Sequence, residues 1–582
     1  MCGVRIRPWW LVGDGMGRDV TGLRGLGPGA AVARAAEQRP DGVAMTFVDY
    51  GSDGGVRSAL TCRELADRSA AVAACLLRAT RPGERAAILC GHDGDYVVAF
   101  LGCLRAGVIG VPLFAPEPYR PFDRLVNVIA DCTPEVVLTS GRHLDAVGRL
   151  LASPALVAPP REVVAVDRLG SGGGVGLPPA PAGDAVAYLQ YTSGSTRAPA
   201  GVRVRHRNVV AAVAQLGAWL PGDESSRLVS WLPFFHDMGL MFSVMLPLSR
   251  GVAVTCLAPL AFVKQPRRWL ELLTAERATH TMSPNFGLDL CVDRVGPQRR
   301  AGIDLSGLRA LGNGAEPVRH RTLVRFTEAF AACGFRHEAH CPGYGLAEAT
   351  LVVTAHEPGR PVRVGAFDRQ ELCAGRVRPV GVADAGARLI VSSGRPVRQQ
   401  VRIVRPGTGA ATDAVGEIWV RGANVCGGYW GQPQRSAETF GGGGAGWLRT
   451  GDLGFLLDGR LYVTGRLRDL IVIDGRNHCP ADIEATVEEA GPWLRRGRVV
   501  AFGSEIDDAE RLVVVAEPVS RVSAADAEVI RARVRAQVSR HHDVGVHALV
   551  LLRAGGLPVT SSGKPRRREC RIRFERGEFG GG

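Results

Sequence analysis

From about residue 28 onward, short apolar runs alternate with segments of helical periodicity. AAILC (86–90), VIGVPLF (108–114) and EVVLTS (135–140) have the length and composition of buried strands, whereas YVVAFLGCLRAG (96–107) has the period of a helix that ends at a glycine. Strands joined by helices pair in parallel, because the crossover returns the chain to the same edge of the sheet. The alternation therefore predicts an α/β fold of mostly parallel sheets covered by helices.

The pattern changes after about residue 468. Short strands and two helices then form a compact α+β unit of about 110 residues, a common domain size. The strands are expected at 470–474, 498–504, 511–519 and 547–553, and the helices from Pro480 and over about 523–540. We therefore predict a flexible arm over 1–27, a large N-terminal domain over 28–467 and a small, mobile C-terminal domain over 468–582.

The charge balance says little about nucleic acid. The 582-residue chain carries a formal charge of +14, with 71 Lys and Arg against 57 Asp and Glu. Only Lys264 and Lys564 are lysines, and the arginines are scattered apart from a cluster at 566–568. A cluster of that size is usually a solvated face, so nucleic-acid binding is not expected.

Cysteine usage indicates the compartment. The 14 cysteines are spread along the chain without a C-x-x-C pair, which is typical of buried free thiols in a reducing environment. A zinc site at Cys333, His337, His340 and Cys341 is not favoured, because the spacing matches no familiar zinc motif. The N-terminus lacks the apolar run of a signal peptide, and no stretch reaches about 18 uncharged apolar residues. We expect a cytoplasmic protein without a membrane span.

The segment AYLQYTSGSTRAPAGV (187–202) is the first that carries chemistry. A strand ends at Tyr191, and a Thr/Ser/Gly loop follows whose backbone N–H groups and hydroxyls can surround a polyphosphate. It is not a Walker loop, because G-x-x-x-x-G-K-(S/T) is absent. Composition alone is more typical of an ordinary turn.

The string itself resembles the phosphate loop of the adenylate-forming superfamily, which includes acyl-CoA synthetases, peptide-synthetase adenylation domains and luciferases. The usual form is Y-T-S-G-(S/T)-T-G-x-P-K-G-V, from which Arg197 and Ala200 depart. The variant S-T-R-x-P-A-G-V is similar to the loop of one branch, the fatty acyl-AMP ligases. The resemblance covers about 28–575 and implies that the loop binds the phosphates of ATP through Thr192, Ser193, Gly194, Ser195 and Thr196.

Three further segments resemble the superfamily in the required order. WLPFFHDMGLM (231–241) is similar to the W-L-P-x-x-H-D-M-G-L of the same branch, and SPNFGLDLC (283–291) to its acyl-pocket segment. The resemblance implies that His236 lines the acyl pocket, and a strand end before a helix start fits Asp237 as an N-terminal cap. NGAEPV (313–318) resembles the loop against adenine, which implies nucleotide contacts from Asn313, Gly314, Ala315 and Glu316.

The next two motifs supply a flat ring and carboxylates. GYGLAEATL (343–351) resembles Y-G-x-(A/T)-E, in which Tyr344 and Gly345 face the purine. Glu348 is a hard oxygen ligand suited to Mg²⁺, and Thr192 on the phosphate loop would help to hold the same ion. WLRTGDLGFL (447–456) supplies Asp452, and the resemblance implies that this carboxylate accepts from the ribose hydroxyls.

The last two motifs lie at the start and near the end of the predicted C-terminal domain. GRLRDLIVIDGRNHCPADIE (465–484) resembles the hinge segment of fatty acyl-AMP ligases, which implies that Arg466 contacts ribose and Arg468 lies at the hinge. LPVTSSGKPRRRECR (557–571) resembles the catalytic lysine loop. Lys564 would bridge carboxylate and phosphate oxygens as a compact point charge, which arginine does not duplicate.

The segment 355–380 contains F-D-R-x-x-L-x-x-G and resembles the insertion of fatty acyl-AMP ligases, where it is thought to hinder domain rotation. The resemblance implies an enzyme that uses ATP and Mg²⁺ to convert a fatty or other carboxylic acid to its acyl-adenylate with release of pyrophosphate. The acyl group then passes to the phosphopantetheine thiol of an acyl carrier protein in trans, for polyketide, nonribosomal peptide or lipid biosynthesis. The arginines at 566–568 are a candidate docking patch for that acidic carrier.

Three alternatives stay open. An acyl-CoA ligase would transfer to free CoA, against which the insertion and the S-T-R-x-P-A-G-V loop argue. In an amino-acid-adenylating enzyme, Asp237 would pair with the α-amino group. A catalytically silent nucleotide-binding scaffold is disfavoured because Lys564, Glu348 and Asp452 are all present.

Overall fold

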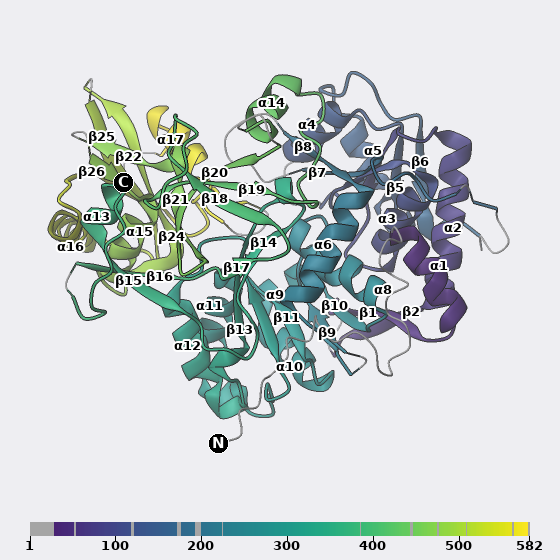
Figure 1. Cartoon of the computed structure of the whole chain (residues 1–582), viewed down its shortest axis with the longest axis horizontal. Helices are drawn as coiled ribbons and strands as arrows, with labels where there is room; N and C mark the ends of the chain where they lie inside the picture. The colour runs from purple at the N-terminus through teal and green to yellow at the C-terminus, as the bar shows by residue number, and fades with distance from the viewer. Residues whose placement is uncertain are drawn as a thin grey trace.

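The computed structural model describes residues 28–51, 54–117, 122–170, 176–177, 179–191, 199–223, 225–384, 386–442, 446–473, 476–507, 509–560 and 564–579. The predicted arm at 1–27 and the phosphate-loop residues Thr192, Ser193, Gly194, Ser195 and Thr196 lie outside these ranges. Figure 1 shows the larger sheets on one side and the segment after residue 468, in yellow-green, on the other.

The first large sheet has six strands in the order β6-β5-β3-β4-β7-β8. All its pairings are parallel except that of β7 with β8. Its strands are β3 (Arg85–Leu89), β4 (Ile109–Pro112), β5 (Val136–Thr139), β6 (Glu162–Ala165), β7 (Val186–Tyr191) and β8 (Gly201–Arg205). Helices α3 (Gly94–Ala106), α4 (Asp123–Cys132) and α5 (Leu144–Leu151) connect them. Helix α3 begins where Asp93 accepts from the N–H groups of Asp95 and Tyr96, and it ends at Gly107 with φ 67°.

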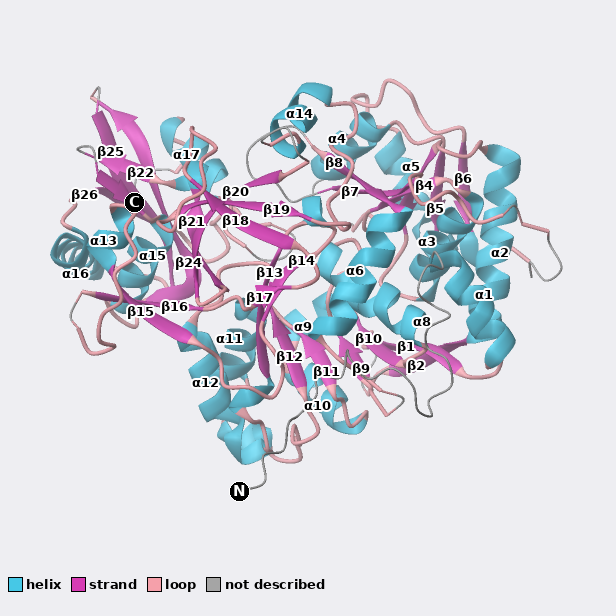
Figure 2. Cartoon of the chain, in the orientation of Figure 1, coloured by secondary structure: helices cyan, strands magenta, loops and turns pink. Residues whose placement is uncertain are grey.

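The second large sheet has nine strands in the order β17-β14-β13-β12-β11-β9-β10-β1-β2. Its central strands pair in parallel and its outer strands antiparallel. The strands are β1 (Val43–Asp49), β2 (Val56–Thr61), β9 (Leu228–Ser230), β10 (Val254–Leu257), β11 (His280–Met282), β12 (Ala310–Asn313), β13 (His340–Gly345), β14 (Val352–Ala355) and β17 (Arg395–Pro396). Helices pack around both large sheets, so the predicted α/β fold of mostly parallel sheets covered by helices is confirmed (Figure 2).

Further helices before residue 468 are distributed along the chain among its strands. They are α1 (Pro28–Gln38), α2 (Cys62–Ala79), α6 (His206–Trp219), α7 (Asp237–Leu240), α8 (Leu246–Arg250), α9 (Pro259–Lys264), α10 (Arg267–Ala275), α11 (Asn285–Arg294), α12 (His320–Phe330) and α14 (Pro433–Phe440). A π-helical turn, Met241–Met245, joins α7 to α8 in one continuous, buried run. Such turns are rare and often lie at functional sites.

From β14 to β24 (Leu494–Ile506) the strands pair antiparallel. The hairpin β15 (Val364–Asp368) and β16 (Ala387–Val391) encloses α13 (Arg369–Cys373), which lies in the predicted insertion. A four-stranded antiparallel sheet follows, made of β18 (Gln400–Val404), β19 (Gly416–Arg421), β20 (Leu448–Leu457) and β21 (Arg460–Arg466).

The segment after residue 468 forms its own layer. A three-stranded sheet of β24 (Leu494–Ile506), β25 (Ala509–Pro518) and β26 (Val546–Leu551) packs with α15 (Pro480–Glu489) and α16 (Ala524–His542) in one apolar cluster. The short pair β22 (Ile471–Ile473) and β23 (Arg476–His478) precedes it, and α17 (Arg567–Glu575) follows it. The domain boundary at 467/468 stays a prediction.

The predicted insertion and the strand β16 that follows it contact this C-terminal unit through polar groups. Arg388 on β16 lies 2.7 Å from a carboxylate oxygen of Asp482 on α15. His542 Nε2 lies 2.7 Å from Thr486 Oγ1 and 3.4 Å from Arg369 Nη1 of α13. Burial raises the pKa of Asp482, and Arg388 only partly offsets that effect. A charge removed from this pair would leave its partner buried alone, which is strongly destabilising.

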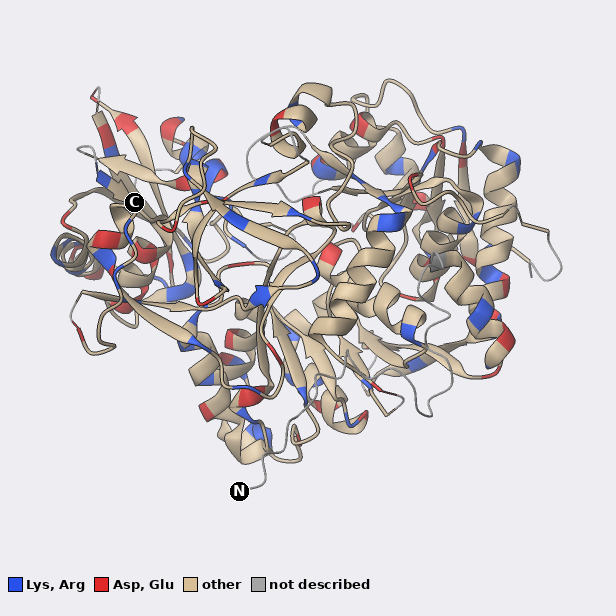
Figure 3. Ribbon diagram, viewed as in Figure 1, with Lys and Arg blue, Asp and Glu red and all other residues tan. Residues whose placement is uncertain are grey.

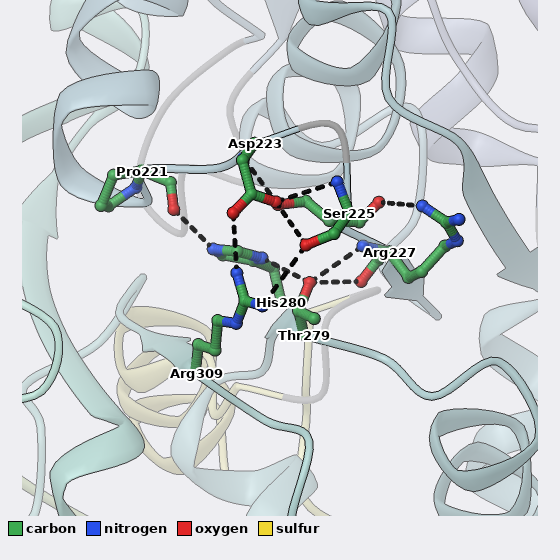
Figure 4. A network of polar contacts seen from close by, with 8 residues as sticks. Pro221, Asp223, Ser225, Arg227, Thr279, His280 and Arg309 are labelled. Carbon is green, nitrogen blue, oxygen red and sulfur yellow. Dashed lines mark hydrogen bonds and ion pairs between the residues drawn. The ribbon is translucent and has the colours of Figure 1, made fainter.

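A polar network ties the amino-terminal ends of three strands of the nine-stranded sheet (Figure 4). His280 lies at the start of β11, where its Nε2 contacts the Pro221 carbonyl at 3.0 Å. Asp223 accepts from the Ser225 hydroxyl at 2.6 Å and pairs with Arg309 at 3.1 Å. Ligands in α/β sheets bind at the carboxyl ends of strands, so this network lies at the opposite edge and belongs to the scaffold.

The thiols and charges are distributed as follows. Of the thirteen cysteines in the described ranges, all are free and all except Cys373 are buried. His337 Nδ1 and His340 Nε2 both contact Thr327 Oγ1, at 3.0 and 3.2 Å, and no metal-ligand group occurs among the residues the structure describes. Positions of Lys and Arg are interspersed with those of Asp and Glu along the ribbon (Figure 3). Within the same ranges, no helix is both long and apolar enough to cross a membrane.

The fully buried His340 makes stability depend on pH. Burial lowers its pKa from 6.5 to about 3, so the unfolded chain binds a proton that the folded chain does not. The free energy of unfolding should therefore fall as the pH drops below 6.5, by about 2 kcal/mol from this residue at pH 5. Urea unfolding at pH 7 and pH 5 measures the loss, and His340→Met should reduce it. If the free energy of unfolding fell as much in His340→Met as in the unaltered chain, the effect would belong to other groups.

Candidate active site

The carboxyl ends of β12 and β13 bring two predicted motifs together. The strands pair in parallel with Asn313 opposite Pro342, so the loops that begin at Asn313 and Tyr344 leave the same edge of the sheet. Asn313 is fully buried, and neither its amide oxygen nor its amide nitrogen has a hydrogen-bond partner among the described residues. A buried amide without partners is costly, so Asn313 is suited to a ligand contact.

The backbone is close-packed at the end of β13. A Cβ on Gly345 would lie 1.8 Å from the carbonyl oxygen of Leu351, so only glycine fits there. On the neighbouring loop, Ala315 adopts φ 69°, which is unfavourable for a residue with a side chain. Both positions lie within the motifs that the sequence analysis assigned to nucleotide binding.

Lys564 reaches this loop from the C-terminal unit. Its Nζ donates to the carbonyl oxygen of Ala315, 249 residues away in sequence. Burial lowers the pKa of Lys564, and the acidic groups of Glu316 and Asp237 partly offset that effect. The only other lysine, Lys264, ends α9 and is exposed. The ammonium group of the C-terminal unit therefore lies near carboxylates of the N-terminal part.

Asp452 is held on both carboxylate oxygens. Tyr344 donates its hydroxyl to Oδ2 at 2.7 Å, and Arg466 donates from Nε to Oδ1 at 2.9 Å. The register of β20 and β21 places Asp452 opposite Arg466. Asp452 raises the pKa of Arg466, and burial raises that of Tyr344, so both remain protonated donors. Each oxygen keeps a second lone pair for a further donor.

His236 and Asp237 begin α7, with a shift of one residue from the prediction. The cap is His236, which has extended backbone angles, whereas Asp237 is the first helical residue. The prediction that Asp237 is the cap was therefore wrong. The Met238 N–H still donates to Asp237 Oδ1 at 2.7 Å, and His236 Nδ1 lies 2.7 Å from the same oxygen. Burial raises the pKa of Asp237, but His236 and the Met238 N–H together bring it below its ordinary value.

Glu348 lies in a short 3₁₀ turn, Ala347–Ala349, that follows β13. Its Oε1 accepts a hydrogen bond of 2.8 Å from the hydroxyl of Tyr429. Magnesium is usually held by one or two carboxylates together with substrate phosphates, so a single carboxylate with remaining lone pairs fits that ion. Thr192, its predicted partner, lies outside the described residues.

The arginine cluster at 566–568 is not one exposed patch. Arg567 is three-quarters buried and donates to Asp469 at 2.8 Å, to Glu484 at 2.6 Å and to the Ala501 carbonyl at 2.9 Å. Only Arg568 is exposed. The docking patch inferred from the sequence is therefore wrong for Arg567, whose charge is engaged inside the C-terminal unit.

The comparison with protein families decides the classification. The model of the family described as "AMP-binding enzyme" matches residues 32–430, more than half of the chain. The chain belongs to the AMP-binding enzyme family.

Curated members of this family resemble the chain over nearly its whole length. The 4-hydroxyphenylalkanoate adenylyltransferase of Mycobacterium marinum is 41% identical, covering 94% of this chain and 91% of its own. The long-chain-fatty-acid–AMP ligase FadD26 of the same organism is 39% identical, covering 94% of this chain and 96% of its own.

Solved structures of AMP-binding enzymes agree. One from a study of fatty acyl-adenylate ligases of E. coli and L. pneumophila has a TM-score of 0.85 at 31% identity, covering 96% of this chain and 98% of that one. Another, an L. pneumophila fatty acyl-adenylate ligase in complex with acyl adenylate and pyrophosphate, has a TM-score of 0.74 at 33% identity, with coverage of 96% and 98%. The predicted fatty acyl-AMP ligase branch and the predicted enzyme class, an acid–AMP ligase, are confirmed.

Tyr429 was missed from the sequence, and the contacts of Arg567 inside the C-terminal unit were not foreseen. Tyr429 lies in CGGYWG (426–431), whose glycines and aromatic residues suggest only a turn. Arg567 lies in a run of arginines that resembles a solvated face. In both cases the partner carboxylate is at least 80 residues away in sequence, so no local spacing reveals the pair.

Proposed function

We propose that this AMP-binding enzyme activates a fatty or related carboxylic acid with ATP and then transfers the acyl group to an acyl carrier protein. The observation that carries the proposal is the convergence of Lys564 with the Ala315–Glu316 loop, beside Asp237. Three separate segments thereby meet around one cation, at the edge of the sheet where the Asn313 side chain has no hydrogen-bond partner among the described residues.

In the first half-reaction, a carboxylate oxygen of the acid forms a bond to the α-phosphorus of ATP, and the bond to pyrophosphate breaks. Lys564 would contact the carboxylate and phosphoryl oxygens, where negative charge accumulates in the transition state. Asp452 would accept hydrogen bonds from the ribose hydroxyls, and Arg466 would donate to them. Tyr344 would lie against the purine. His236 would line the acid's pocket.

Glu348 and Thr192 are the residues we assign to Mg²⁺. When bound, the ion neutralises charge on the phosphate oxygens. Glu348 is oriented for this by Tyr429, and the described residues contain no cluster of three ligands that would bind a metal without substrate. The site therefore suits an ion that arrives with ATP.

The second half-reaction would join the acyl carbon to the phosphopantetheine thiol of the carrier and release AMP. The contacts of Arg388 with Asp482 and of Arg369 with His542 support a C-terminal unit held in the adenylating arrangement by the predicted insertion together with β16. Arg568, the exposed arginine beside the lysine segment, is the revised candidate for docking an acidic carrier. We place the enzyme in the cytoplasm, in keeping with its free thiols.

The test is one incubation with ATP, Mg²⁺ and a panel of acids that includes long-chain fatty acids and 4-hydroxyphenylalkanoates. Acyl-AMP should form from a subset of the panel, and addition of CoA should give little acyl-CoA, whereas an acyl carrier protein with its pantetheine arm should consume the adenylate. Efficient acyl-CoA formation would instead identify an acyl-CoA ligase. Adenylate formation from amino acids alone would favour the amino-acid-activating alternative, and none from any acid would contradict the proposal.

A further inference from the structure

We infer that Tyr429 is a positioning residue that fixes the carboxylate of Glu348 for metal-bound ATP. The inference rests on the proposed function, because it assigns Glu348 to the ion that accompanies the nucleotide. It adds a residue outside all of the motifs that the sequence analysis recognised.

Tyr429 is itself rigidly held. It is 6% exposed, its backbone N–H donates to Ser436 Oγ at 2.8 Å, and its ring packs on Phe440 with centroids 5.4 Å apart. The guanidinium carbon of Arg435 lies over the ring, 4.3 Å from its centroid. The hydroxyl of this fixed ring donates to Glu348 Oε1 at 2.8 Å.

Residues 424–432, the strap, also form hydrogen bonds with the backbone around Glu348. The Cys426 N–H donates to the Glu348 carbonyl at 2.9 Å, and the Asn424 side chain donates to the Ala349 carbonyl at 2.9 Å. Thr350, a β-branched residue at φ 62°, donates its hydroxyl to the Asn424 carbonyl at 2.7 Å. Such a backbone angle persists only where its surroundings impose it, and here the strap supplies that constraint.

The same strap is bonded to the strand that leaves the predicted phosphate loop. Tyr429 forms a bridge with Val202 on β8, and the Trp430 N–H donates to the Gly201 carbonyl at 2.8 Å. Gln432 donates to the Pro199 carbonyl at 3.1 Å. Residues 424–432 therefore join the Glu348 turn to the start of β8. The Tyr429 side chain completes that connection, because its hydroxyl donates to the Glu348 carboxylate.

Removing only the hydroxyl tests the role. In Tyr429→Phe, the Mg²⁺ concentration for half-maximal adenylate formation should rise about tenfold, the low end of the effect of deleting a group that orients a metal ligand. The KM for the acid should stay unchanged, and high Mg²⁺ should restore kcat. Electron paramagnetic resonance of Mn²⁺ with α,β-methylene ATP, which cannot release pyrophosphate, should show the same loss of affinity without turnover. Tyr462→Phe is the matched control, because Tyr462 is also 6% exposed but packs with Phe367 and Phe455.

The outcomes separate cleanly. Unchanged Mg²⁺ and Mn²⁺ affinities in Tyr429→Phe would overturn the inference, even if its melting temperature fell. An equal loss in Tyr462→Phe would also overturn it, since the effect would then be general. If the unaltered chain formed no adenylate and bound no Mn²⁺ with the nucleotide, the proposed function would fail and this inference with it.

Discussion

Lys564→Ala should lower the rate of acyl-adenylate formation by about 100-fold or more, the usual effect of removing one preorganised donor from a charged transition state. Lys564 is the ammonium group that reaches the Ala315 loop, and its neighbours Glu316 and Asp237 are acidic. Pyrophosphate release measures the rate. The chain supplies its own control in Lys264→Ala, because that exposed lysine at the end of α9 should leave the rate unchanged. Equal, undiminished rates in both variants would show that Lys564 takes no part in adenylation, whereas no pyrophosphate release by the unaltered chain would support the silent-scaffold alternative.

The charge of Lys564 can be tested separately from its size. Burial lowers its pKa below 10.5, so the required ammonium form is lost as the pH rises through that lowered value. The adenylation rate should therefore fall on the alkaline side at a lower pH than an exposed lysine would give. In Lys564→Arg the rate should be low, because a guanidinium is larger and planar, but the alkaline limb should disappear since arginine stays charged. A limb that persists in Lys564→Arg would assign the titration to another group.

Three strands of the parallel part were predictable because each is a short apolar run separated from the next by a helix. The runs at 86–90 and 108–114 became β3 and β4, and the run at 135–140 became β5. The sequence pattern did not distinguish the four-stranded antiparallel sheet from the parallel part of the fold. In β20 the burial does not alternate strictly along the strand, so the period-two signal of an antiparallel strand is weak there.

The candidate site was predictable to the extent that its residues lie in contiguous motifs. Tyr344, Asp452 and Arg466 come from three motifs, and the structure joins them by hydrogen bonds. What stayed hidden was the support around those motifs, since it depends on pairs brought together only by folding. Tyr429 meets Glu348 from 81 residues away, and Arg567 meets Glu484 from 83. A run of arginines gives no sign of which one is enclosed by carboxylates.

Arg567→Ala should lower the free energy of unfolding of the C-terminal unit by about 3 kcal/mol, because it leaves two partly buried carboxylates without their cation. Arg567 joins three places: Asp469 after the predicted hinge residue Arg468, Glu484 on α15 and the Ala501 carbonyl on β24. It also begins α17, three residues after Lys564. The substitution should therefore reduce adenylation as well, because the lysine segment loses its anchor.

The neighbouring Arg568→Ala is the matched control, since that exposed side chain should contribute little to stability. Arg567→Lys should give an intermediate loss, because an ammonium keeps the charge but cannot reproduce the planar fork that serves three acceptors. Hydrogen exchange of the backbone amides of β24 and β25, whose apolar residues belong to the core cluster of this unit, measures its stability. Pyrophosphate release measures adenylation under conditions where each variant is folded. If Arg568→Ala reduced stability and adenylation as much as Arg567→Ala, the anchoring role of Arg567 would be wrong. If only the transfer to the carrier declined in Arg568→Ala, its proposed docking role would gain support while the anchor remained with Arg567.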